Sequence, residues 1–303
     1  MTKAFSFEDC LARAERINWR VDELIGPDKR LDFSKPFMPE ALARTAPLDF
    51  LTADERLELN QIRGNAYLVM FGLVEEFILP FLLDHARPQA TGESYRSRAM
   101  LQFAAEEAKH IHLFRTFAAA FAEEFGVRCK TIGPPEAIAA HVLSHPPLSV
   151  ALLILHIEWM SQRHFTESIQ DEQQLDPRFK DLLLHHWMEE QQHAQIDTLL
   201  VEEIAAGCTP AQIDEAIEGY KRLGAFLDEG LRQQAAFDLE ALEATRGKPF
   251  GKAERERFMA VQHQANRWTY VGSGLSHPRF IETIRRLKPN AVAEFEAMAE
   301  LFA

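Results

Sequence analysis

Apolar residues recur at helical spacing along most of the chain, and four long segments show the pattern most clearly. Two of these segments open on a helix start signal: Thr52 and Glu55 form a capping box, and Asp176 precedes a proline at the first helical position. Gly126 follows the second segment, where a helix commonly ends. No stretch alternates with the period of two that is typical of a β-strand. The pattern predicts long helices over residues 52–86, 94–125, 147–173 and 177–206.

Shorter elements flank these four segments. Apolar positions such as Cys10, Ala14 and Val21 predict a helix over residues 6–25, and clustered prolines predict an extended connection over 26–50. Further helices are expected over 135–144 and 209–245, with two or three more in 251–303, broken at Gly272, Gly274, Pro278 and Pro289. The chain is therefore expected to be all-α.

The second and fourth long segments carry the same short motif, Glu107-x-x-His110 and Glu190-x-x-His193. Positions three apart lie on one face of a helix, so each carboxylate and its imidazole can reach one metal ion together. One such pair occurs by chance in many solvated helices. Two copies 83 residues apart, each on the second helix of a pair, indicate a duplicated hairpin folded into a four-helix bundle. Such bundles bind two iron or manganese ions, and their other two helices each add one Glu.

The first helix of each pair offers a carboxylate inside an apolar run. Glu158 lies in such a run, where an unpaired carboxylate would be costly and a metal ion would compensate it. Glu158 precedes Glu190 by 32 residues, and Glu75 precedes Glu107 by the same 32. The helical phase of Glu75 also places it opposite the charged positions of its helix. Glu76 lies nearer to those positions and is the second choice.

These residues form a set of four carboxylates and two imidazoles. Oxygen-rich donors of this kind suit iron or manganese and argue against copper or zinc. Glu106 and Glu189 each precede a ligand and are candidates for accepting the second N–H of a ligating imidazole. The competing interpretation, solvated Glu-rich helices, would have to explain both motifs and the matched spacings. The candidate metal ligands are Glu75, Glu107, His110, Glu158, Glu190 and His193.

Composition and charge narrow the class of function. With 303 residues, 47% of them hydrophobic, the chain can bury a large core. We expect one helical domain over 1–303, with a metal-binding bundle over 52–206 and helices of 207–303 packed on it. A net charge of −13 disfavours binding to nucleic acid or to an anionic membrane.

Cysteine spacing and hydropathy point to a cytoplasmic protein. Cys10, Cys129 and Cys208 are odd in number, far apart and without Cys-x-x-Cys spacing, which argues against a disulfide scaffold and a zinc ribbon. The N-terminus lacks the apolar run of a signal peptide. The longest apolar stretch without a charge, residues 66–74, is too short to span a bilayer.

Over residues 52–206 the motifs resemble the ferritin-like di-iron carboxylate superfamily. The stretch from Glu107 to His110 is similar to the second-helix motif of the ligand-binding oxidases related to the ribonucleotide reductase small subunit. Those oxidases commonly have Asp where this chain has Glu106. They also carry a cross-linking tyrosine where this chain has Leu153. The missing tyrosine argues against that branch.

A second branch shares one more histidine. His186 lies four residues before Glu190, and the pattern His186-x-x-x-Glu190-x-x-His193 is similar to that of the p-aminobenzoate (arylamine) N-oxygenase family. In that family a third histidine joins the six usual ligands. The resemblance implies that His186 is a seventh ligand and that the cofactor is a pair of iron ions, with Mn/Fe as the alternative. It also implies dioxygen as co-substrate.

The resemblance therefore implies a dioxygen-activating di-iron oxygenase that oxidises an aromatic or alkyl amine. The alternatives are a ligand-binding di-metal oxidase, with Mn/Fe or Fe/Fe, and a non-enzymatic ferritin-like iron-binding protein. Arg96, Arg98 and Arg163 could hold a substrate carboxylate, although surface ion pairs are the commoner role for such residues. The expected partners are a small-molecule substrate, an external electron donor and a second copy in a homodimer, without nucleic acid or membrane.

Overall fold

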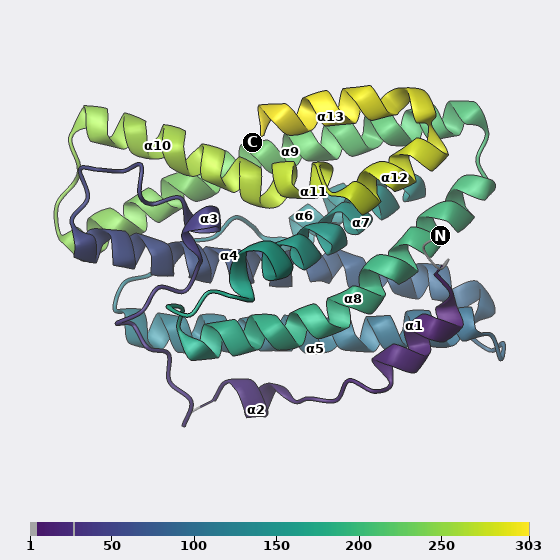
Figure 1. Cartoon of the computed structure of the whole chain (residues 1–303), viewed down its shortest axis with the longest axis horizontal. Coiled ribbons are helices and arrows are strands. Elements are labelled where there is room, and N and C mark those ends of the chain that lie inside the picture. The colour runs from purple at the N-terminus through teal and green to yellow at the C-terminus, as the bar shows by residue number, and fades with distance from the viewer. Residues whose placement is uncertain (1–4, 27, 303) are drawn as a thin grey trace.

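A computed structural model describes residues 5–26 and 28–302. Within these ranges the named secondary-structure elements are all helices or helical turns (Figure 1). The four long predicted helices are α4 (Ala53–Ala86), α5 (Tyr95–Phe125), α7 (Pro147–His164) and α8 (Pro177–Ala206). They form two hairpins, α4 on α5 and α7 on α8, which meet where α5 contacts α8. The predicted all-α fold with a ferritin-like four-helix bundle is confirmed.

The local start and stop signals fix the ends of the bundle helices. The hydroxyl of Thr52 accepts the N–H of Glu55, whose carboxylate accepts the N–H of Thr52 in return. The carboxylate of Asp176 caps α8 by accepting the N–H of Phe179. Gly126 ends α5 in the left-handed region with φ of 88°. α7 ends earlier than predicted and continues as a π-helical turn, η2 (Phe165–Ile169).

Further helices cover two sides of the bundle (Figure 1). α9 (Pro210–Arg246) lies across α4 and α7, and α6 (Pro135–Leu143) packs on α4. On the other side, α1 (Phe7–Ala14) and α2 (Val21–Leu24) contact α5 and α8. The remaining helices are α3 (Glu40–Ala43), α10 (Lys252–Arg267), α11 (Ser273–Leu275), α12 (Pro278–Leu287) and α13 (Val292–Leu301), with the turns η1 (Arg87–Gln89), η3 (Trp268–Gly272) and η4 (Pro289–Ala291).

The predicted helix over residues 6–25 is wrong in its second half. α1 stops at Ala14, and the chain leaves helical geometry until α2 begins at Val21. The break lets Trp19 turn inward, where it is 5% exposed and stacks on the His110 ring with centroids 6.0 Å apart. Apolar periodicity cannot indicate this break, because its cause is a contact with a distant helix.

The predicted helix ends at Gly272 and Gly274 are also wrong in position. Both glycines lie in helical backbone, in η3 and α11, and the break follows Leu275. A Cβ atom on Gly274 would collide with the ring of His156. Here glycine permits close packing of two helices rather than ending one.

One helix passes a length and hydropathy test for a membrane span within the described residues. This segment is α4 with its following turn, Ala53–Gln89, and 67% of its most apolar window is buried inside the structure. Burial of this kind is what the core helix of a folded domain shows, so the hydropathy of α4 reflects its place in the bundle.

Replacing Gly64 with alanine should destabilise the bundle. A Cβ atom at Gly64 on α4 would lie 2.7 Å from Cβ of Phe37 and 3.3 Å from the Phe179 ring. Overpacking of this kind costs roughly 1–3 kcal/mol. The matched control is Gly224→Ala on α9, which meets no atom within 4 Å and should stabilise by roughly 0.5–1 kcal/mol. Chemical denaturation measures the free energy of unfolding of both variants. Equal stability of Gly64→Ala and the parent protein would contradict the packing described.

Candidate metal centre

Seven titratable side chains from the four bundle helices converge in the core. On α5 and α8 the three- and four-residue spacings hold them on one helix face. None of the seven residues is more than 3% exposed. They are Glu75 from α4, Glu107 and His110 from α5, Glu158 from α7, and His186, Glu190 and His193 from α8.

The donor atoms form two overlapping groups. Glu75, His110, His186 and Glu190 make one group, and Glu107, His110, Glu190 and His193 make the other, each with donor atoms within 4.8 Å of one another. Oε1 of Glu190 lies between three imidazoles, 3.1 Å from His186 Nε2, 3.3 Å from His110 Nδ1 and 3.2 Å from His193 Nδ1. Two adjacent cation positions that share Glu190 would fit this arrangement.

Glu158 lies outside both groups but beside Glu190. Burial and the neighbouring Glu190 carboxylate raise the pKa of Glu158 well above its usual value. Its Oε2 atom has no hydrogen-bond partner among the described residues. Glu158 is thus a further oxygen donor at the edge of the second group.

Several donor atoms are buried without a hydrogen bond to any described residue. They include Oε2 of Glu75, both carboxylate oxygens of Glu107 and Nδ1 of His110. Nδ1 of His193 comes within 3.0 Å of Oε1 of Glu107, but this approach lacks the direction of a hydrogen bond. Unpaired buried carboxylates are costly, and bound cations would remove that cost. The donor set therefore fits two divalent ions, and its carboxylates and imidazoles suit iron or manganese.

The electrostatics of the metal-free cluster agree with this fit. Burial and the Glu107 charge raise the pKa of Glu75 well above its usual value. Burial opposes protonation of His186, but the Glu190 and Glu75 carboxylates outweigh it and raise the pKa of His186 to about 10. Protons thus compensate part of the buried charge, and metal ions would displace them on binding.

Glu106 and Glu189 fix the two motif histidines across the helix pair. Glu189 on α8 accepts a hydrogen bond from Nε2 of His110 at 2.8 Å, and Glu106 on α5 accepts one from Nε2 of His193 at 2.8 Å. Each carboxylate therefore serves the histidine of the opposite helix. With Nε2 protonated, the lone pair of Nδ1 is free to face the centre of the cluster.

The two supporting carboxylates have different partners, which sequence reasoning missed. Nζ of Lys109 lies 2.5 Å from Glu189 and 3.8 Å from the centre of the Trp19 ring. Glu106 instead accepts a hydrogen bond from Gln102 at 2.8 Å. The support behind His110 is thus paired with a cation and the support behind His193 with a neutral amide. Gln102 is one helical turn before Glu106, so its spacing was a usable signal, whereas the Lys109 contact crosses between helices.

Asp197 is a further residue that sequence reasoning missed. It lies on α8, four residues after His193, and is 2% exposed. Burial raises its pKa well above the usual value; His193 opposes the shift, and the Glu107 and Glu190 charges add to it. Its Oδ2 atom has no hydrogen-bond partner in the described part of the chain. Positions 186, 190, 193 and 197 form one helical stripe, and that spacing could have revealed it.

Comparisons with known proteins add little to this geometry. No family model matches the chain, and no curated protein does. The chain is similar to solved structures of R2-like ligand-binding oxidase mutants. One mutant, with an Fe/Fe cofactor, has 15% sequence identity and a TM-score of 0.45, and the match covers 87% of this chain and 92% of the oxidase chain. Another mutant, with an Mn/Fe cofactor, has 14% sequence identity and a TM-score of 0.46, and the match covers 86% of this chain and 92% of the oxidase chain. At these values the likeness carries no conclusion about function.

Replacing Glu75 with glutamine should reduce metal loading. The change keeps the shape of the side chain but removes a buried charge from the first donor group, so we expect about one ion per chain instead of about two. The matched control is Glu76→Gln, because Glu76 points to the protein surface and pairs with Arg115 at 2.7 Å. Metal analysis after anaerobic loading and desalting measures both variants. Loss of metal in Glu76→Gln but not in Glu75→Gln would contradict the assignment.

Proposed function

We propose that this protein is a dioxygen-dependent di-iron oxygenase that transfers oxygen to the nitrogen of an amine. The observation that carries the proposal is the third histidine: Nε2 of His186 lies 3.1 Å from Glu190 and 3.2 Å from Glu75, within the first donor group. We further propose that the enzyme is cytoplasmic and takes electrons from an external donor.

In this proposal the seven residues hold two ions in unlike surroundings. Glu75, His110 and His186 would hold one ion, and Glu107, Glu158 and His193 would hold the other. Glu190 belongs to both donor groups and would serve both ions. A bound pair of ferrous ions supplies electrons for the reduction of dioxygen. The four carboxylates balance the four positive charges of two divalent ions, so the loaded site would be close to neutral and stable in a dry core.

Aromatic rings around the cluster keep water away from this chemistry. The Phe103 ring stacks on His193 with centroids 3.8 Å apart, and Phe71 and Phe114 meet His186 edge-on at 5.3 and 5.0 Å. Exclusion of water strengthens the electrostatic interactions in the site and prevents side reactions.

Burial favours an enzyme over an iron-storage protein. A storage protein must pass ions onward, which requires donors that lead from the site to solvent. In this chain the proposed ligands are at most 3% exposed, and both motif histidines are held by a supporting carboxylate.

The test is oxygen uptake by the ferrous protein with and without arylamines, combined with product analysis for oxidised nitrogen. The parent protein should consume more oxygen when an arylamine is present. His186→Ala should lower this rate by at least about tenfold, because loss of even a residue that only supports a metal ligand costs roughly 10–100-fold. His112→Ala, an exposed histidine on α5, is the matched control and should act like the parent. A protein that retains two irons but shows no arylamine-dependent uptake would be an iron-binding protein instead.

A further inference from the structure

The metal cluster has a closed side and a side that faces additional helices. Trp19 and the supporting residues Glu106 and Glu189 cover the two motif histidines, beneath α1 and α2. The opposite pair of bundle helices, α4 and α7, carries one carboxylate ligand each and is covered by α6 and α9 (Figure 1). Space for a substrate is therefore expected between the helix pair α4 and α7 and the helices α6 and α9 that cover it.

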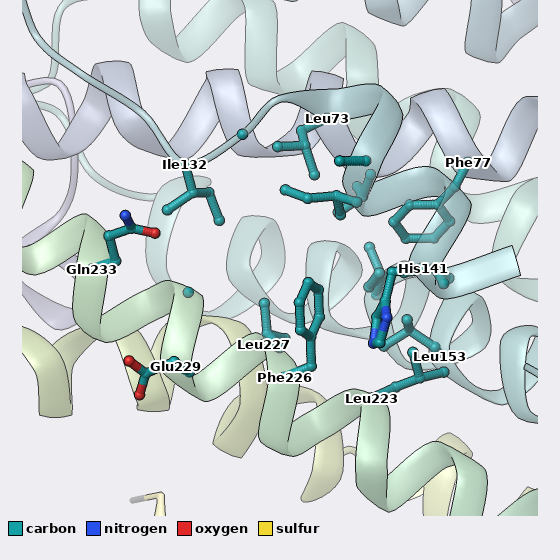
Figure 2. Close-up of a pocket in the computed structure, with 17 residues that line it drawn as sticks. Leu73, Phe77, Ile132, His141, Leu153, Leu223, Phe226, Leu227, Glu229 and Gln233 are labelled. Atoms are coloured by element: carbon teal, nitrogen blue, oxygen red, sulfur yellow. The ribbon is translucent and has the colours of Figure 1, made fainter. Parts of the chain in front are cut away.

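A cavity of about 390 Å³ lies there (Figure 2). Its inner wall comes from α4 and α7, and its outer wall from α6, α9 and the loop before α6. Val74 and Ile157 belong to the inner wall, and they directly precede the proposed ligands Glu75 and Glu158. The cavity thus borders the two helix segments that hold the carboxylate side of the cluster. Its volume is in the range of small-molecule sites.

The lining of the cavity is mainly apolar. Leu73, Phe77, Leu153 and Leu223 form much of the wall. No lysine or arginine lines it among the described residues. Its one carboxylate, Glu229, is exposed and already pairs with Arg232 at 2.7 Å. A charged substrate would thus lose its hydration without gaining a counter-charge.

The arginines suggested by the sequence as carboxylate anchors lie elsewhere. Arg96 pairs with Glu203 at 2.6 Å, Arg98 with Glu15 at 2.7 Å and Arg163 with Glu167 at 2.8 Å. None of the three arginines lines the cavity. These arginines form ion pairs with partly exposed partners, and a substrate carboxylate has no anchor in the cavity.

We propose that this cavity is the substrate compartment and that it accepts an uncharged arylamine without a carboxylate. The proposal rests on the oxygenase function proposed above and names its substrate class. An arylamine is neutral at physiological pH, whereas an alkylamine is protonated and an aminobenzoate carries a negative charge. Only the neutral compound matches a wall that offers apolar contacts and no counter-charge.

The rim of the cavity suits an aromatic ligand. Phe226 on α9 is 40% exposed although its ring is apolar. The centre of this ring lies 4.2 Å from the centre of the His141 ring on α6. Both residues line the cavity (Figure 2). Exposed aromatic surface at the mouth of an apolar cavity can contact an entering ring, and the burial gained would favour binding.

The first experiment compares a neutral probe with a charged one of similar shape. Fluorine NMR titration of the full-length protein with 4-(trifluoromethyl)aniline and 4-(trifluoromethyl)benzoate gives both affinities. We expect the aniline to bind at least about tenfold more tightly, since removing a charge from water without a partner is costly. Equal affinity, or tighter binding of the benzoate, would overturn the proposed substrate class.

The second experiment places the probe relative to the metal centre. In protein loaded with paramagnetic Mn²⁺, the fluorine signal of the bound aniline should broaden relative to metal-free protein. Leu227→Trp fills the cavity from α9, far along the chain from every proposed ligand, and should abolish binding. Ala225→Trp, at an exposed position on the same helix that does not line the cavity, is the matched control. Unchanged affinity in Leu227→Trp, or no broadening by Mn²⁺, would refute the location.

These results separate the two proposals. Binding and broadening are measured without turnover, so they test the cavity even if the ferrous protein consumes no oxygen with arylamines. In that case the proposed oxygenase function would be refuted, while the proposed ligand site would be supported. Arylamine-dependent oxygen uptake that is retained in Leu227→Trp would leave the function intact and refute the compartment.

Discussion

The structure depends on compensating negative charge buried in the centre of a helical bundle. Four carboxylates, Glu75, Glu107, Glu158 and Glu190, come from four different helices and meet where water is excluded. Apolar packing cannot offset that charge, and burial together with the neighbouring carboxylates raises the pKa of Glu75 and of Glu158 well above the usual value. Two divalent ions would neutralise it. The helix caps and the matched spacings place these carboxylates within reach of one another.

The two halves of the bundle repeat one design but are not equivalent. Each hairpin supplies a Glu and a Glu-x-x-His motif, and each motif histidine is held by a carboxylate of the other hairpin. The differences lie at the ends of the α8 stripe, where His186 adds an imidazole to one donor group and Asp197 adds a buried carboxylate near the other. Lys109 behind His110 and Gln102 behind His193 add a further difference. Unlike surroundings would give two bound ions different electronic properties, which would suit a reaction in which the ions have different roles.

Features fixed by local spacing could be predicted from the sequence. The ends of α4 and α5 follow from a capping box and a glycine, and the helix that carries each candidate ligand follows from apolar periodicity. Features set by contacts between distant segments could not. The inward turn of Trp19 interrupts a periodic segment, and the exchange of partners between Glu106 and Glu189 depends on how α5 faces α8. The cavity likewise arises only where α9 crosses α4 and α7.

Binding of two metal ions by the seven-residue cluster can be tested by crystallography. Crystals of protein loaded anaerobically with ferrous iron are measured on both sides of the iron absorption edge. Two anomalous peaks are expected inside the cluster, one beside His110 and His186 and one beside His193. A single peak, or iron found only outside the cluster, would contradict the binding of two ions there.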